Sequence, residues 1–168
     1  MKTILVALVL LSASVASHLL GQDDNESTRK TLAGLRGIRV LAGVAMDSDQ
    51  ARRDGLSGEQ LQTDVELKLR EAGVAVLSLQ DSSAPVLTVN VFVLRGSPQR
   101  FYAFSIAVEV QETVTLNRNP SVAVWTDTWR TPTTLGTVSV GQLRSVRDNV
   151  RDVVDQFINA YLAANPKR

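Results

Sequence analysis

Three stretches in the second half of the chain alternate between apolar and polar residues, and each predicts a β-strand. They cover residues 86–94, 101–116 and 122–131. In the longest stretch every second residue from Tyr102 to Leu116 is apolar except Glu112, and the positions between them are polar or small: Ala103, Ser105, Ala107, Glu109, Gln111, Thr113 and Thr115. Successive side chains of a strand point to opposite faces, so this strand should bury one face and turn the other toward water. Turn residues between the stretches favour an antiparallel meander.

The first half of the chain predicts a strand, a helix and a second strand. Residues 38–46 form an apolar run that is typical of a buried strand. Ser57 and Gln60 then have the spacing of a helix capping box, and apolar residues recur every fourth position after them. A second apolar run, residues 74–79, is interpreted as the next strand. Two strands that are separated by a helix favour a parallel pair with a right-handed crossover.

The last expected element is a long amphipathic helix over residues 140–164. Ser139 and Gln142, just before it, again have the spacing of a capping box. This order of elements predicts an α+β fold, in which a mixed sheet of about five strands is built from a βαβ unit followed by an antiparallel meander. Both helices should pack on one face of the sheet, which leaves the other face open.

The beginning of the chain has the composition of a bacterial signal peptide. A lysine is followed by an apolar run over residues 4–11 and by small residues, so we expect cleavage after Ala16 or Ser17, which ends the signal peptide at residue 17. A membrane anchor is the alternative, but the apolar run is much shorter than the ~20 residues that span a bilayer. Residues 18–34 are interpreted as a flexible polar linker, and residues 35–168 as a single domain. We therefore expect a periplasmic or secreted protein without stable membrane insertion.

The composition excludes several kinds of chemistry. The chain of 168 residues has no cysteine, which rules out disulfides, thiolate metal sites and thiol nucleophiles. The one histidine, His18, follows the leader, so the domain has no imidazole for a catalytic triad or a zinc site. Beyond the leader, basic and acidic residues are equal in number, and this balance gives no electrostatic basis for binding nucleic acid. We expect no cofactor.

Two stretches of the chain resemble known proteins. Residues 55–74 run from Gly-Leu-Ser to Ala-Gly-Val, and residues 146–167 contain an Asp-x-Phe-x-Asn-Ala-Tyr-Leu pattern made by Asp155, Phe157, Asn159, Ala160, Tyr161 and Leu162. The chain resembles an uncharacterised family of exported bacterial proteins over about residues 35–167, and that family has no assigned activity. The element order is more loosely similar to envelope-assembly modules such as the lipopolysaccharide-transport accessory lipoproteins and the N-terminal domain of curli-secretion proteins. Those modules are typically anchored through a cysteine, which this chain lacks.

Two functions from different classes remain open at this point. We favour an exported, non-catalytic binding or envelope-assembly module that holds a protein or an envelope polymer through an open sheet face or an edge strand. Its binding residues are expected on the polar face of the long strand and in the turn before it: Ser105, Glu109, Gln111, Thr113, Arg95 and Arg100. The alternative is a carboxylate- or metal-dependent enzyme that uses Asp47, Asp49 and Asp54, which cluster after the first strand.

Two tryptophans stand at alternate positions of the last expected strand. Trp125, Asp127 and Trp129 should therefore share one face, an arrangement that suits stacking against a sugar or a peptide side chain. Tryptophans on a sheet more often pack beneath a helix, so we expect them under the last helix instead.

Overall fold

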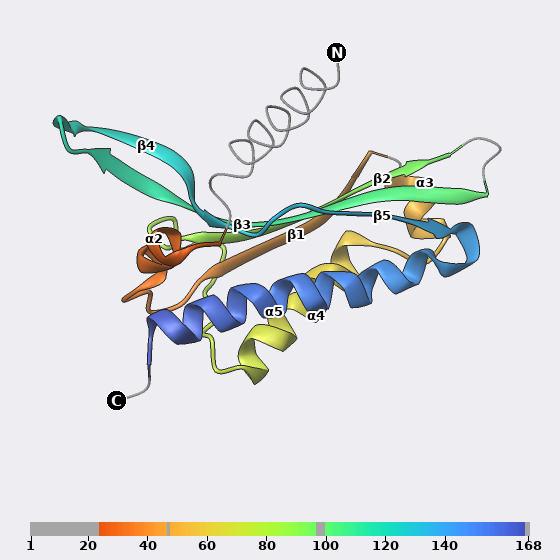
Figure 1. Ribbon diagram of the computed structural model, residues 1–168, viewed down its shortest axis with the longest axis horizontal. Coiled ribbons are helices and arrows are strands. Elements are labelled where there is room, and N and C mark those ends of the chain that lie inside the picture. The colour runs from red at the N-terminus through yellow and green to blue at the C-terminus, as the bar shows by residue number, and fades with distance from the viewer. Residues whose placement is uncertain (1–23, 47, 97–99, 167–168) are drawn as a thin grey trace, which may run out of the picture.

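The computed structural model describes residues 24–46, 48–96 and 100–166, in which one mixed sheet carries helices on a single face (Figure 1). The expected signal peptide lies outside the described residues. The strands are β1 (Arg39–Met46), β2 (Val86–Arg95), β3 (Phe101–Leu116), β4 (Asn119–Arg130) and β5 (Thr134–Ser139). β1 and β2 pair in parallel, and all other pairs are antiparallel. The α+β class with a five-stranded mixed sheet is confirmed.

β3 is the central strand and determines the shape of the sheet. It has 16 residues, pairs with β2 on one side, and on the other side pairs with β5 along its first part and with β4 along its second part. Beyond Gln111 the partner strand β2 has ended, so β3 and β4 continue as a two-stranded ribbon. Figure 1 shows this ribbon projecting away from the rest of the sheet.

Two long helices cover the sheet on the same side, as expected (Figure 1). α4 (Gly58–Glu71) begins where predicted, because the Ser57 hydroxyl accepts a hydrogen bond from the backbone N–H of Gln60 at 3.3 Å. α5 (Val146–Ala164) begins later than predicted. The short 3₁₀ helix η2 (Val140–Ser145) precedes it, and Ser139 caps neither helix with its side chain.

The core lies between these helices and one face of the sheet. The apolar positions of β3 that alternate with its polar ones, from Tyr102 to Val110, are buried. Phe157 of α5 packs its ring edge-on against Trp129 of β4, with 5.4 Å between the ring centroids. The side of α5 that packs against the sheet is therefore the side on which its sequence repeats apolar residues with the helical period.

Several local predictions were wrong. Residues 74–79 form no strand, because they contribute only a single bridge between Val76 and Ile38. The parallel partner of β1 is instead β2, the next apolar stretch. β5 was not predicted, and neither was the short helix α3 (Ser48–Arg53), which contains Asp49.

The segment interpreted as a flexible linker is folded over its described part. It forms α2 (Glu26–Arg29) and the 3₁₀ helix η1 (Lys30–Leu32), and Leu32 is fully buried. Asp24 accepts hydrogen bonds from Arg29 and from the indole N–H of Trp129, the latter at 3.0 Å. Asn165, which follows the last residue of α5, holds the other end, since its side chain donates to Leu32 O and accepts from Gly34 N. The described part of this polar segment thus contacts β4 and the end of α5.

Candidate functional site

The face of the sheet opposite α4 and α5 has no helix over it in the part of the chain that the structure describes (Figure 1). We call it the open face. It is built from the residues of β3 that alternate with the buried ones. Strand pairing places residues of the neighbouring strands beside them, so that paired residues form rows across the sheet. One row runs from Phe92 through Ser105 to Leu135, and another runs from Thr88 through Glu109 to Arg130.

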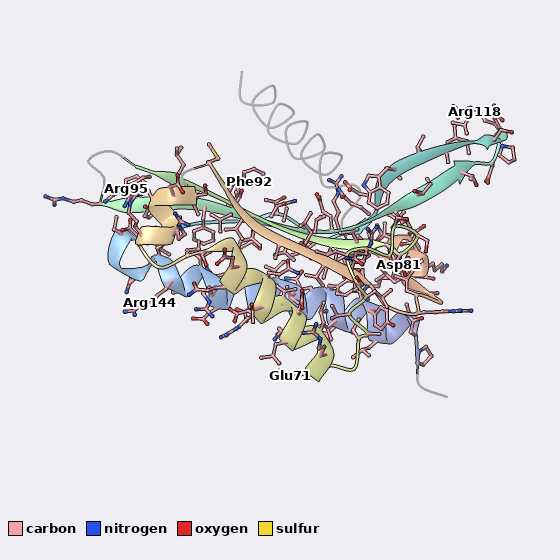
Figure 2. The ribbon with its side chains drawn as sticks, turned by 180° about the vertical axis from the view of Figure 1, so that it is seen from behind. Glu71, Asp81, Phe92, Arg95, Arg118 and Arg144 are labelled. Carbon is pink, nitrogen blue, oxygen red and sulfur yellow. The ribbon has the colours of Figure 1, made fainter. Side chains whose placement is uncertain are left out.

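The first row lies in the apolar half of the open face. Phe92, Leu94 and Leu135 expose 42%, 52% and 75% of their surface, although all three sit in strands. They border a shallow depression of about 210 Å³ that Met46 and Ala103 also line. Figure 2 shows Phe92 pointing away from the helices. Three large apolar side chains are thus exposed in one part of the open face.

The second row begins the polar half of the open face. Gln111 donates to the carboxylate of Asp127 at 2.8 Å and accepts from the indole N–H of Trp125 at 3.4 Å. Burial raises the pKa of Glu109, the nearby charge of Asp127 raises it further, and Arg130 partly counteracts both. The charge of Asp127 thus acts on Glu109 more strongly than that of Arg130. Arg39 adds a second positive charge to this half, because it pairs with Val86 in the row of Gln111 and Asp127.

The structure gives different positions to the six residues expected to bind. Ser105, Glu109, Gln111 and Thr113 lie along the open face, as their alternation requires. Arg95 does not join them, because it pairs with Tyr102 and its guanidinium lies 5.8 Å from the centroid of that buried ring on the helix side. Arg100 is exposed at the end of the sheet, next to η2. That any of these residues binds a ligand stays a prediction.

Phe92, Leu94 and Leu135 were missed as site residues. Phe92 and Leu94 continue the alternation of Thr88 and Asn90, so their face was available from the sequence. The sequence interpretation followed only the apolar face of that strand. Leu135 was missed with its whole strand, for which the alternation of Leu135, Thr137 and Ser139 was the signal.

The two tryptophans do not share a face. A β-bulge shifts the register between Val110 and Gln111, so Trp129 pairs with Val110 on the buried face while Asp127 pairs with Gln111 on the open face. Trp129 is buried against α5, as the interpretation that placed tryptophans under a helix expected. Trp125 is half exposed on the open face, which that interpretation did not expect.

The acidic residues of the alternative enzyme do not converge where they are described. Asp54 accepts a hydrogen bond from the buried hydroxyl of Tyr102 at 2.7 Å, and this bond lowers the pKa of Asp54. Asp49 is exposed and lies 3.6 Å from Arg52. Asp47 lies outside the described residues. Within the described ranges, no group of three acidic or imidazole side chains is arranged to hold a metal ion.

The outer edge of β1 is largely occupied. Ile38 exchanges backbone hydrogen bonds with Ala75 and Leu77, and the side chain of Gln62 bonds Val40 O and Ala42 N at 2.9 and 2.7 Å. These contacts use the backbone groups that an added strand would need. The open face is therefore the better candidate than this edge.

Comparison with known proteins finds no matching family model and no matching curated protein. Three solved structures are similar at low level: a dodecamer of a PelC variant from Paraburkholderia phytofirmans, a minor lipoprotein from Acinetobacter baumannii and the rare lipoprotein B from Shewanella oneidensis. Their sequence identities are 15%, 11% and 14%, and their TM-scores are 0.35, 0.26 and 0.27. They cover 85%, 77% and 75% of this chain and 91%, 93% and 92% of their own.

The resemblance noted in the sequence is thus supported only in its loosest form, a likeness to envelope lipoproteins. At TM-scores this low the three structures carry no argument about what this chain does. None of the helices in the described ranges is long and apolar enough to cross a bilayer.

Proposed function

We propose that this chain is an exported, non-catalytic module of the bacterial envelope that binds a protein segment through its open face. The observation that carries the proposal is the apolar half of the open face, where Phe92 and Leu94 of β2 and Leu135 of β5 are exposed. Exposed side chains of this size contribute free energy to binding when a partner covers them, roughly 1.5–3 kcal/mol for each one fully buried. The export of the protein rests on the composition of its leader.

The charges of the open face indicate the chemistry of the partner. Asp127 is close enough to Glu109 for its charge to raise the pKa of Glu109. A basic side chain placed between them would relieve this repulsion. Ser105, in the apolar row, is four residues from Glu109, which corresponds to roughly 13 Å along a strand. The partner that fits is therefore a segment whose apolar side chains lie roughly 13 Å along the strand from a lysine or arginine.

The proposal predicts that apolar and charged substitutions on the open face weaken the capture of one envelope protein. Purified mature protein would be photo-crosslinked in envelope extract and the yield of a defined adduct measured. Leu135→Gln and Glu109→Lys should each lower that yield about tenfold, by the loss of one apolar or one charged contact. Leu67→Gln is the matched control, because Leu67 is as exposed as Leu94 but lies on α4.

Three outcomes would contradict the proposal. An adduct whose yield is equal in the parent, Leu135→Gln and Leu67→Gln proteins would place the contact elsewhere. Loss of binding after digestion of envelope polysaccharide would make the partner a polymer. A stoichiometric bound metal without any protein adduct would favour the carboxylate enzyme.

The same sample tests export, since its amino terminus should begin after Ala16 or Ser17. Intact Met1 in the membrane fraction would show that the leader is an anchor.

A further inference from the structure

The ribbon made by residues 111–127 of β3, β4 and their connecting turn extends beyond the apolar half of the open face, and we call it the arm. None of its residues is buried. It consists of β3 and β4 alone, because β2, and β1 beyond it, begin opposite Gln111, and β4 has no strand on its outer side within the described chain. Figure 2 shows Arg118 at the tip, far from the helices.

The arm exposes apolar side chains on both of its faces. Val124 pairs with Val114 on one face, and Trp125 pairs with Thr113 on the other. Val124 and Trp125 expose 38% and 50% of their surface. A two-stranded ribbon is only marginally stable in water by itself, and a third or fourth strand is what usually stabilises it. The arm is thus a segment whose stability depends on contact with another strand.

The free outer edge of β4 is where another strand can add. Along residues 119–127 the sheet provides β4 with no strand partner other than β3 in the part of the chain that the structure describes. At the base of the arm, the Thr31 hydroxyl donates to Thr128 O at 3.1 Å and so limits the free edge on that side. Near the tip, Pro120 lacks an N–H to donate. The central residues, around Val122 and Val124, are the ones available for pairing.

The charges of the arm are arranged so that it complements a second copy of itself. Arg118 is the positive charge at the tip, and Glu112 and Asp127 are the negative charges at the base. The residues between them are uncharged. Two arms that lie side by side in antiparallel orientation bring each tip next to the base of the other. Parallel arms would instead place like charges together.

We propose that two copies of this chain associate through their arms, β4 beside β4 in antiparallel orientation, to form a four-stranded sheet around a two-fold axis. The two-fold operation repeats every contact, so each dimer contains two contacts between Arg118 and the acidic base of the partner arm. Val124 and Trp125 lie near the centre of the interface. This association goes beyond the proposed function, because it leaves the apolar half of the open face, with Phe92 and Leu135, free in both copies.

Sedimentation equilibrium of the mature protein at several concentrations tests the association. We expect a dimer whose dissociation constant increases with salt, because the tip-to-base contacts are exposed and screened. Arg118→Glu should weaken the dimer about tenfold, since both symmetric contacts change from attraction to repulsion. Adding Asp127→Lys to Arg118→Glu should recover most of the loss. Arg144→Glu, an equal charge change on exposed η2, is the matched control and should leave the dimer unchanged.

Thermal unfolding of each variant confirms that the fold is retained, which is expected because Arg118 is exposed at a turn. A protein that is monomeric at all concentrations would overturn the proposal. So would a dimer that is insensitive to Arg118→Glu. Oligomers larger than a dimer that dissociate in Leu135→Gln would show that the arm of one copy occupies the open face of the next. The stoichiometry is measured without any envelope partner, so failure here is distinct from failure of the proposed function.

Discussion

On the helix side of β3, Tyr102, Ile106 and Val110 are fully buried, whereas Ser105 and Glu109 of the same strand turn outward and are only partly covered. The two faces share one backbone, one set of hydrogen bonds and one register. They differ in what lies above them, which is a layer of two helices on one side and no helix of the described residues on the other. Strand pairing alone therefore does not determine burial in this sheet, and the free energy of folding comes mainly from the covered face.

The covered face also holds the N-terminal segment. Tyr161 of α5 donates its hydroxyl hydrogen to Leu35 O at 3.0 Å, and Asn165 bonds two backbone groups of residues 32–34. Tyr161, which belongs to the Asp-x-Phe-x-Asn-Ala-Tyr-Leu pattern of α5, thus has a structural use in this chain. Within the described residues no helix covers the open face in the same way.

The largest expected effect separates a phenylalanine of the covered side from one of the open face. Phe157→Ala should lower the free energy of unfolding by about 3–5 kcal/mol, because it leaves a cavity against Trp129. Phe92→Ala should cost less than about 1.5 kcal/mol, since Phe92 is already partly in water. Denaturant unfolding measures both. Equal shifts of the midpoint would mean that the open face contributes as much to stability as the core, and the comparison would fail.

A pair of strand glycines sharpens the comparison. Gly136 of β5 lies on the covered side, where an added Cβ would come within 2.5 Å of the Phe104 ring, whereas Gly43 of β1 has no atom within 4 Å of that position. Gly136→Ala should therefore destabilise the protein by about 1–2 kcal/mol through overpacking. Gly43→Ala should stabilise it by a few tenths of a kcal/mol, because alanine has less conformational entropy than glycine to lose on folding. Thermal unfolding should give shifts of opposite sign, and shifts of the same sign would refute the assignment of the faces.

The sequence predicted those parts of the fold in which one period continues without interruption. β3 alternates from Phe101 to Gln111, and α4 and α5 keep helical spacing, so these buried faces were predicted correctly. The polar half of the open face followed from the same alternation. Val114 and Leu116 continue the apolar positions of β3 but lie in the arm and are not buried. Leu162 continues the apolar period of α5 but is partly exposed near the end of the helix.

The sequence did not predict features in which a local event changes the period or the partner. The bulge near Thr128 adds one residue to β4, which moves Trp129 to the opposite face from Trp125. Residues 74–79 have the apolar composition of a strand, but beyond Ile38 the side chain of Gln62 bonds the outer edge of β1 that they would need, so only one bridge forms. β5 is short and contains Gly136, so its pattern was weak and Leu135 was missed with it. Phe92 and Leu94 were missed for another reason, because the interpretation followed only the apolar face of their strand.

The smallest expected effect concerns Glu109, whose charged form is disfavoured by burial on the polar half of the open face and by the charge of Asp127. Removing the charge should stabilise the fold at neutral pH. We expect Glu109→Gln to raise the free energy of unfolding by about 0.5 kcal/mol or less, because the group is partly screened by solvent. Asp127→Asn should give part of the same gain, since it removes the second cause of the raised pKa.

The pH dependence distinguishes this effect from a change in packing. A carboxyl whose pKa is raised in the folded state binds its proton more tightly there than in the unfolded chain. Between the ordinary value of 4.5 and the raised pKa, folding therefore takes up a proton, and the free energy of unfolding falls as the pH rises. Below 4.5 the carboxyl is protonated in both states and the cost disappears. Denaturant midpoints of parent and Glu109→Gln should thus converge in acid and separate toward neutral pH. A constant difference across this range would mean that Glu109 contributes through shape rather than charge.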